Sequence, residues 1–219
     1  MMERLSLAMA AKTHGMLKTH LFPGDGNESA AVLICKAALR NGRRLLVRET
    51  ILVPHEACRV RAPDRIVWPG AYIEEAIARA EAEGLTILLI HSHPGGWLEF
   101  SRADDESDTR TMPALFAAFG NRHGSAIMAP NGAIRARLYR PDMSFDAIEL
   151  VTVSGHDISY WWNEDIHNGV LVQWPLPFTE GMRRQLGRLS FAVIGVSGTG
   201  SVVAEQLARL GIGKLTLID

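Results

Sequence analysis

Two histidines, a serine and an aspartate are spaced so that they could build a metal site. The pattern is His91-Ser92-His93-Pro94, and seven residues separate His93 from Ser101-x-x-Asp104. The histidines come directly after the apolar run 85–90, which predicts a buried strand. Residues two apart on a strand face the same side, so both imidazoles can reach one point. Two imidazoles and one carboxylate suit Zn²⁺ and leave a fourth position for water, as in catalytic zinc sites.

Hydrolysis at such a site needs a base for the proton of water and a donor for the developing oxyanion. Glu28, between a turn and a predicted strand, is the predicted base, and Ser101 is the predicted donor. Glu49 and Glu56 are alternatives for the base. Ser101-x-x-Asp104 also matches a helix capping box, a role that requires no chemistry.

Hydrophobic periodicity predicts the elements that must position these residues. The expected helices cover Ala10–Leu21, Ala71–Glu83 and Asp104–Phe119, the last interrupted near Pro113. The expected strands cover Arg4–Met9, Ser29–Leu39, Leu45–Val53, Leu85–Ile90, Ala126–Ala129, Ala133–Tyr139 and Ile148–Val153. Asn41-Gly42 predicts a hairpin between the second and third strands. This order predicts an α/β fold with a mixed sheet, of the α+β kind.

Composition narrows the choice of partners. The 219 residues are 47% hydrophobic and 21% charged, and Lys+Arg 23 against Asp+Glu 24 leaves a formal charge of −1. No basic field favours nucleic acid, and no apolar run approaches the roughly 18 residues that span a bilayer. Cys35 and Cys58 form no C-x-x-C pair and are expected to be buried reduced thiols, which indicates the cytoplasm. The oligomeric state stays open.

The metal motif resembles that of the JAMM (JAB/MPN+) metalloproteases. The upstream segment Glu28-Ser29-Ala30-Ala31-Val32-Leu33 is similar too, with Ala31 where the family often has glycine. The resemblance covers residues 1–153 and implies a JAB/MPN-like domain with cytidine-deaminase-like layering. It implies that His91, His93 and Asp104 bind Zn²⁺, that Glu28 is the general acid/base for the zinc-activated water, and that Ser101 binds the oxyanion. The implied activity is a zinc isopeptidase that cleaves behind the C-terminus of a ubiquitin-like protein.

A second motif lies near the end of the sequence. Gly195-x-Ser197-Gly198-x-Gly200 separates a predicted strand, 190–194, from a predicted helix, 202–210, and a strand, 215–218, precedes Asp219. It resembles the start of the ThiF/MoeB and ubiquitin-activating enzyme family, with Ser197 in place of a glycine. Residues 179–189 are also expected to form a helix. The resemblance covers residues 180–219 and implies a truncated Rossmann-like βαβ fragment there, with residues 154–179 as a linker. Gly195, Gly198, Gly200 and Asp219 would bind ATP with Mg²⁺ only in a complete domain.

The two resemblances together imply a bacterial fusion that processes and adenylates the same ubiquitin-like protein. One alternative is a non-catalytic MPN-like scaffold that binds a ubiquitin-like partner. Another is a substrate-recruiting domain of an ATP-dependent adenylyltransferase. Trp97 and Phe100 are expected to anchor their loop, and contact with an incoming substrate tail is the alternative. The remaining histidines are expected to have no catalytic role, with His55, His123, His156 and His167 in loops.

Overall fold

The computed structural model describes residues 5–38, 43–120, 122–156, 158–163, 182–183 and 186–219. The chain divides into two compact units, Met1–Pro175 and Leu176–Asp219. Each unit is described by itself. Among the described residues, no helix combines the length and apolar character needed to cross a membrane.

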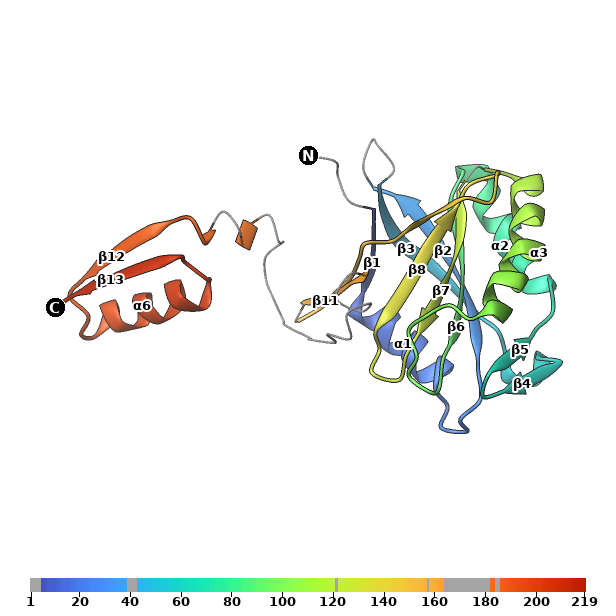
Figure 1. Cartoon of the computed structure of the whole chain (residues 1–219), viewed down its shortest axis with the longest axis horizontal. Helices are drawn as coiled ribbons and strands as arrows, with labels where there is room; N and C mark the ends of the chain where they lie inside the picture. Colours follow the sequence, from blue (N-terminus) through green and yellow to red (C-terminus); the bar gives the residue numbers. More distant parts are fainter. Residues whose placement is uncertain (1–4, 39–42, 121, 157, 164–181, 184–185) are drawn as a thin grey trace. The chain divides into compact units, whose positions relative to one another are not determined.

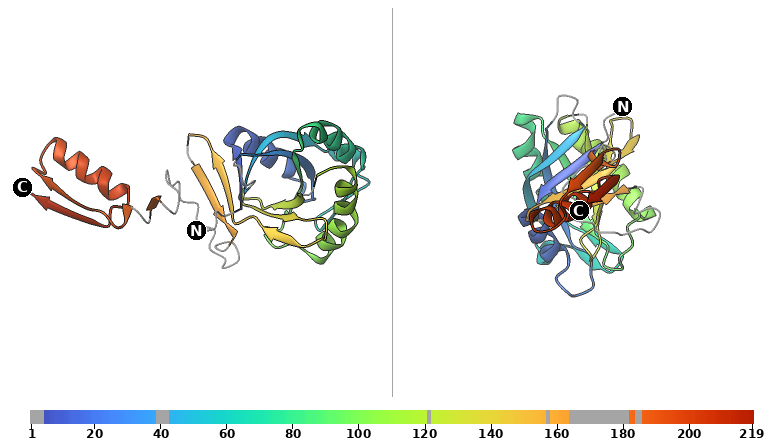
Figure 2. Two further views of the ribbon diagram at one scale, coloured as in Figure 1. Left: turned by 90° about the horizontal axis from the view of Figure 1, so that it is seen from above. Right: turned by 90° about the vertical axis from the view of Figure 1, so that its left-hand side faces the viewer.

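The larger unit is built on one curled mixed sheet, which contains nine strands within its described part (Figures 1 and 2). In sheet order the strands are β11 (Ile158–Trp162), β10 (Leu150–Ser154), β1 (Ser6–Ala10), β3 (Arg44–Leu52), β2 (Ala30–Ala37), β6 (Thr86–Ser92), β7 (His123–Met128), β8 (Ile134–Tyr139) and β9 (Phe145–Ala147). The pairs β1–β10, β1–β3 and β6–β7 are parallel, and the other pairs are antiparallel. Strand β11 lies inside the stretch 154–179 that the sequence marks as a linker, and it pairs with β10.

Helices cover both faces of this sheet. They are α1 (Ala11–Leu21), α2 (Ala71–Ala80) and α3 (Arg102–Ala118), with short 3₁₀ helices at His55–Ala57 and Glu81–Glu83. Helices α2 and α3 lie on one face, and α1 lies on the other (Figure 1). A separate hairpin of β4 (Val60–Ala62) and β5 (Arg65–Val67) follows β3 in the chain. Helix α3 connects the parallel strands β6 and β7, so the chain passes from the carboxyl end of β6 through a loop into the start of α3.

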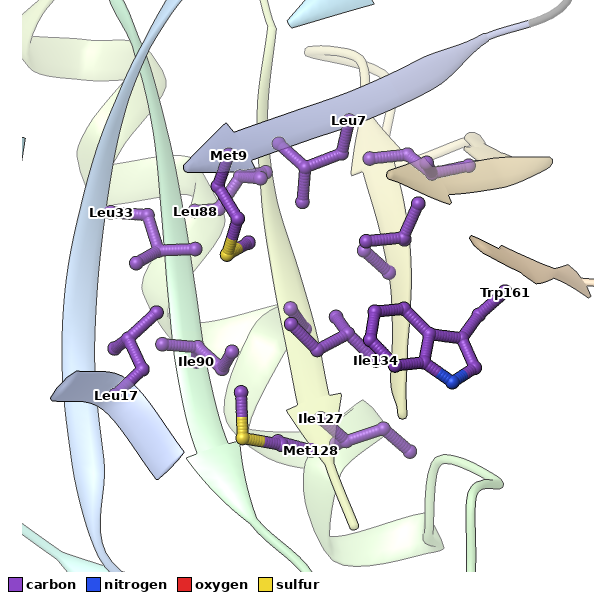
Figure 3. Packing of buried hydrophobic residues seen from close by; sticks show 14 of the residues in the cluster. Leu7, Met9, Leu17, Leu33, Leu88, Ile90, Ile127, Met128, Ile134 and Trp161 are labelled. Carbon is purple, nitrogen blue, oxygen red and sulfur yellow. The ribbon is translucent and has the colours of Figure 1, made fainter. Parts of the chain in front are cut away.

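The central strands are apolar on both faces because both faces are covered. Along β2, Leu33 belongs to the core on the α1 side, whereas Val32 and Ile34 pack with α2 and α3. Figure 3 shows Leu17 of α1 near Leu33 and near residues of β6 in the first of these cores. A strand buried in this way has a strongly specified register, since a one-residue slip would turn its apolar side chains to the wrong face.

Three expectations from the sequence need correction. Helix α3 runs unbroken through Pro113, because Met112 and Leu115 on either side are fully buried and hold it against the sheet. His123 is not in a loop: it begins β7 and is fully buried. Cys58 is only half-buried, whereas Cys35 is fully buried, and both are free thiols. The turn predicted at 41–42 lies outside the described residues, although β2 and β3 do pair antiparallel.

The smaller unit contains one βαβ motif. Strand β12 (Ser190–Ile194) is parallel to β13 (Lys214–Ile218), and α6 (Thr199–Arg209) connects them. Several of its apolar side chains are exposed, among them Ile194 at 79% and Leu217 at 53%. Of the helix expected over 179–189, residues 179–181 and 184–185 lie outside the described residues.

Candidate metal centre

The two histidines meet at the carboxyl end of β6. Their Nε2 atoms are 3.1 Å apart, and the His93 side chain is 10% exposed. Strand β6 lies between β2 and β7 in the sheet, so the backbone that carries His91 is fixed by hydrogen bonds on both sides. The two imidazoles therefore come together as the period of a strand predicts.

Asp104 reaches the same point from the first turn of α3. Its Oδ1 lies 3.0 Å from His91 Nε2, and its Oδ2 lies 3.5 Å from His93 Nε2. The capping box that starts α3 fixes this carboxylate. Asp104 N–H donates to Ser101 Oγ at 3.2 Å, and Ser101 N–H donates to Asp104 Oδ2 at 2.6 Å. The helix-capping and ligand interpretations of this motif are therefore compatible in one geometry.

The spacing of these donor atoms fits a tetrahedral zinc ion. Ligand atoms at 2.0–2.1 Å from tetrahedral Zn²⁺ are about 3.3 Å from one another. The three pairs formed by His91, His93 and Asp104 that the structure records are 3.0, 3.1 and 3.5 Å apart. Two imidazoles and one carboxylate form a donor set that zinc accepts, and three protein ligands leave one position open.

Glu28 lies two residues before the start of β2, and Ala30, the first residue of β2, is opposite His91 in the sheet. One of its carboxylate oxygens lies within 4.8 Å of nitrogens of both His91 and His93, and the residue is only 6% exposed. The alternatives do not share this position. Glu49 is exposed and forms an ion pair with Arg79, and Glu56 is exposed on the 3₁₀ helix at 55–57.

The electrostatics separate the two carboxylates. Burial raises the pKa of Glu28 to about 7, although the neighbouring His91 and His93 oppose the shift. Burial acts in the same direction on Asp104, but hydrogen bonds with the two histidines outweigh it and hold its pKa far below the usual range. A carboxyl group that titrates near neutrality suits a general base, and a permanently ionised one suits a metal ligand.

The loop between the two motifs also orients a ligand. His93 Nδ1 lies 2.7 Å from the carbonyl oxygen of Trp97. Because a carbonyl can only accept a hydrogen bond, Nδ1 carries the proton, and the lone pair of Nε2 can bind a metal. Leu98 anchors the loop in the core, and Arg135 donates to its carbonyl oxygen at 3.1 Å. Trp97 is 70% exposed, so the anchoring expected of it is wrong. Phe100 is half-buried beneath the Arg137 guanidinium, whose carbon lies 3.8 Å from the ring centre, in agreement with anchoring.

Sequence reasoning missed the polar residues behind the centre. Arg137 on β8 pairs with Asp105 at 2.6 Å and with Asp108 at 2.7 Å, and these two residues follow Asp104 on α3 by one and four positions. Asp108 also accepts a hydrogen bond from Ser125 on β7. The sequence did contain a signal for these contacts: Arg135 and Arg137 lie inside an otherwise apolar predicted strand. A buried charge requires a partner, so these arginines indicated ion pairs or hydrogen bonds within the fold.

The glycine-rich loop of the smaller unit forms a tight turn between β12 and α6. A Cβ on Gly200 would lie 1.7 Å from the carbonyl oxygen of Gly195, so only glycine fits there. Gly195 and Gly198 both have positive φ, at 82° and 53°. Asp219 Oδ1 accepts a 3.3 Å hydrogen bond from Val196 N–H, so this carboxylate lies against the loop.

The curled mixed sheet, its covering helices and the donor atoms at the end of β6 define an α/β protein with a potential metal-binding centre. A family model described as prokaryotic homologs of the JAB domain matches residues 11–139. This match covers more than half of the chain, and the chain belongs to that family. Its fold is the JAB/MPN-like mixed α/β fold.

Curated proteins match over a much shorter stretch. Ubiquitin-like modifier-activating enzyme 5 is 60% identical over 35 residues in Caenorhabditis briggsae and 57% identical over 35 residues in Bombyx mori, which is 16% of this chain in each case. The chain spans less than a tenth of the length of these relatives, 8% and 9% respectively. A solution structure of a Desulfitobacterium hafniense protein is 17% identical, with a TM-score of 0.46, over 68% of this chain and 94% of that one.

Proposed function

We propose that residues 1–153 form a zinc-dependent peptidase that cleaves behind the C-terminus of a ubiquitin-like protein. His91 and His93 bind the metal through Nε2, and Asp104 binds it through its carboxylate. The observation that carries the proposal is the set of donor-atom separations from 3.0 to 3.5 Å, which fits tetrahedral zinc. Membership of the JAB family, which includes metallopeptidases, supports it.

The residues around the metal divide the chemistry between them. A bound zinc ion polarises a carbonyl group and lowers the pKa of water. Glu28 accepts a proton from the attacking water and returns it to the leaving amine, so that a C–O bond forms and the C–N bond breaks. Ser101 Oγ accepts from Asp104 N–H, which leaves its hydroxyl proton free to donate to the carbonyl oxygen as negative charge develops there.

The proposed substrate is the extended tail of a ubiquitin-like protein. Such a tail can pair with the edge of a strand, where main-chain hydrogen bonds supply affinity without regard to sequence. The exposed indole of Trp97 stands on the loop that orients His93 and provides an apolar contact for the tail. The partial matches to ubiquitin-like modifier-activating enzymes support a partner of this class.

A second function is proposed for residues 180–219. The strand, glycine turn and helix of β12 and α6 resemble the phosphate-binding start of an adenylyltransferase domain. Gly195, Gly198 and Gly200 would let the main chain approach phosphate, and Asp219 would accept from a ribose hydroxyl; the contact of Asp219 with Val196 N–H in the glycine-rich loop supports this role. In a complete domain this segment would bind ATP with Mg²⁺ and adenylate the same ubiquitin-like protein.

The test combines zinc content with cleavage. The parent, His91→Ala and Glu28→Gln proteins are analysed by elemental mass spectrometry and incubated with ubiquitin-like proteins that carry a C-terminal reporter amide. We expect one zinc per chain and cleavage in the parent, neither in His91→Ala, and zinc without cleavage in Glu28→Gln. A folded parent that binds no zinc after reconstitution would contradict the proposal and favour a non-catalytic scaffold that binds a ubiquitin-like partner. Full activity in Glu28→Gln would exclude Glu28 as the base.

A further inference from the structure

The hairpin β4–β5 contacts the segment that carries Glu28 (Figure 1). Arg61, in the middle of β4, donates from Nε to the carbonyl oxygen of Glu28 at 3.0 Å and from Nη2 to Ser29 Oγ at 2.9 Å. The main-chain N–H of Glu28 donates to the carbonyl oxygen of Ala62 at 2.9 Å. Both main-chain polar groups of Glu28 are therefore bonded to one strand of the hairpin.

Arg61 is itself held on its other side. Its Nη1 donates to Asp25 Oδ2 at 2.9 Å, and the Arg61 side chain is only 15% exposed. Asp25 Oδ1 in turn accepts from the main-chain N–H of Asn27 at 3.0 Å, which closes the turn before Glu28. The planar guanidinium thus joins the turn, Glu28 and the start of β2 in one rigid arrangement, which the single ammonium of lysine could not reproduce.

We infer that Arg61 is a positioning residue for Glu28, a role that rests on the proposed function of Glu28 as the general base. A base must lie within about 2.6–3.2 Å of the group whose proton it accepts, and a displacement of about 1 Å can cost about 100-fold in rate. Arg61 supplies this precision through the main chain. It therefore affects the rate of the chemical step rather than the affinity for substrate.

The metal ligands provide an internal reference for this inference. The hydrogen bonds of Arg61 go to Asp25, Glu28 and Ser29, whereas zinc would be held by His91, His93 and Asp104. Removal of Arg61 should therefore leave zinc binding unchanged while it loosens Glu28. A residue with a purely structural role would lower zinc content, thermal stability and activity together.

The experiment compares Arg61→Met and Arg61→Lys with Arg48→Met in the full chain. Arg48 provides a matched control, since it forms a 2.9 Å ion pair with Glu83 on an exposed surface. We measure kcat, KM and zinc content, together with amide hydrogen exchange of a peptide that covers residues 26–31. In Arg61→Met we expect kcat to fall about 10- to 100-fold, with KM and zinc content unchanged and faster exchange over 26–31. Arg61→Lys should be intermediate, and Arg48→Met should match the parent.

Each outcome separates the two proposals. Parental kcat and parental exchange in Arg61→Met would overturn the role of Arg61. An equal loss of zinc and activity would also overturn it, because the residue would then support the whole centre. If Arg61→Met does not fold, Arg61→Lys decides by the same criteria. A parent that binds zinc but cleaves no substrate would contradict the proposed function alone, and the exchange of residues 26–31 would still decide whether Arg61 holds Glu28.

Discussion

The hydroxyl of Ser92 accepts a 2.8 Å hydrogen bond from the main-chain N–H of Ser29. Ser92 stands between the two histidines, and Ser29 directly follows Glu28. Ser92 N–H also donates to the carbonyl oxygen of Ser29 at 2.9 Å. The end of β6 and the start of β2 are thereby held in register, and with them the proposed ligands and the proposed base.

Ser92→Ala should destabilise the protein. The substitution leaves the buried Ser29 N–H without this acceptor, which costs about 1–3 kcal/mol in the free energy of unfolding. Urea unfolding followed by tryptophan fluorescence measures the change. Ser107→Ala, which removes an exposed hydroxyl from α3, is the control and should stay within about 0.5 kcal/mol of the parent. Equal stability of the two variants would show that the Ser92 hydroxyl contributes nothing.

Asp108→Asn should destabilise the protein more strongly. Arg137 and Asp108 form an ion pair whose side chains are 5% and 7% exposed. Loss of one partner from a buried pair costs about 3–5 kcal/mol. We expect the lower end of that range, because Asp105 still pairs with Arg137. Glu106→Gln breaks a pair with Arg102 that is largely exposed, and should cost below about 0.5 kcal/mol in the same urea titration.

Zinc should stabilise the parent against heat. A ligand that binds only the folded state at 100 times its Kd adds about 2.7 kcal/mol. The midpoint of thermal unfolding should therefore rise when zinc is added to chelator-treated protein. His91→Ala should abolish this rise, whereas His156→Ala, at an exposed position after β10, should retain it. A rise of equal size in His91→Ala would place the zinc elsewhere.

His123 should make stability depend on pH. Its Nε2 bonds the Phe119 carbonyl oxygen at 2.8 Å, and its Nδ1 accepts from Ile87 N–H at 3.2 Å, an arrangement that requires the neutral ring. Burial lowers the pKa of His123 below 6.5, although the bond to Phe119 opposes the shift. Below about pH 6.5 the unfolded chain therefore binds more protons than the folded protein. The contribution of His123 to the free energy of unfolding is fully present above about pH 6.5 and falls below it, by at most about 1.4 kcal/mol per pH unit.

The measurement is the difference in unfolding free energy between the parent and His123→Gln from pH 7.5 to pH 5.5. This difference should shrink as pH falls, because only the parent contains a buried imidazole that must stay neutral in the folded state, and only the parent therefore loses this part of its stability at low pH. Phe116→Leu alters a ring that packs on His123 but does not titrate, and its difference from the parent should stay constant. A pH-independent difference for His123→Gln would contradict the prediction.

Trp97→Ala should raise KM without loss of stability. The exposed indole contributes little to folding, so the unfolding free energy should change by less than about 0.5 kcal/mol. Phe100→Ala is the contrasting variant: it removes a ring that packs under Arg137, and should lower stability. Steady-state kinetics on a reporter substrate and urea unfolding separate the two effects. Parental KM in Trp97→Ala would remove this residue from the proposed substrate surface.

The sequence by itself determined the central strands and the residues at their ends. A six-residue apolar run followed by His-x-His requires a buried strand with both imidazoles on one side, because the period of a strand is two. Ser101-x-x-Asp104 matched a capping box at the start of the helix expected from Asp104, and α3 begins at Arg102 with Asp104 in its first turn. These signals are local, since each depends on residues within a few positions of one another.

Only the tertiary structure decided which distant residues join them. Glu28 was one of three possible bases, and the pairing of β2 with β6 brings it beside the histidines across 63 residues of chain. Propensity predicted a break at Pro113 and a loop at His123, but burial on the sheet outweighed it at both positions. The bonds of Arg61 to Glu28 and of Arg137 around Asp104 depend on the approach of separate elements. No local period encodes such contacts, because their energy arises only when the sheet has formed and water has been excluded.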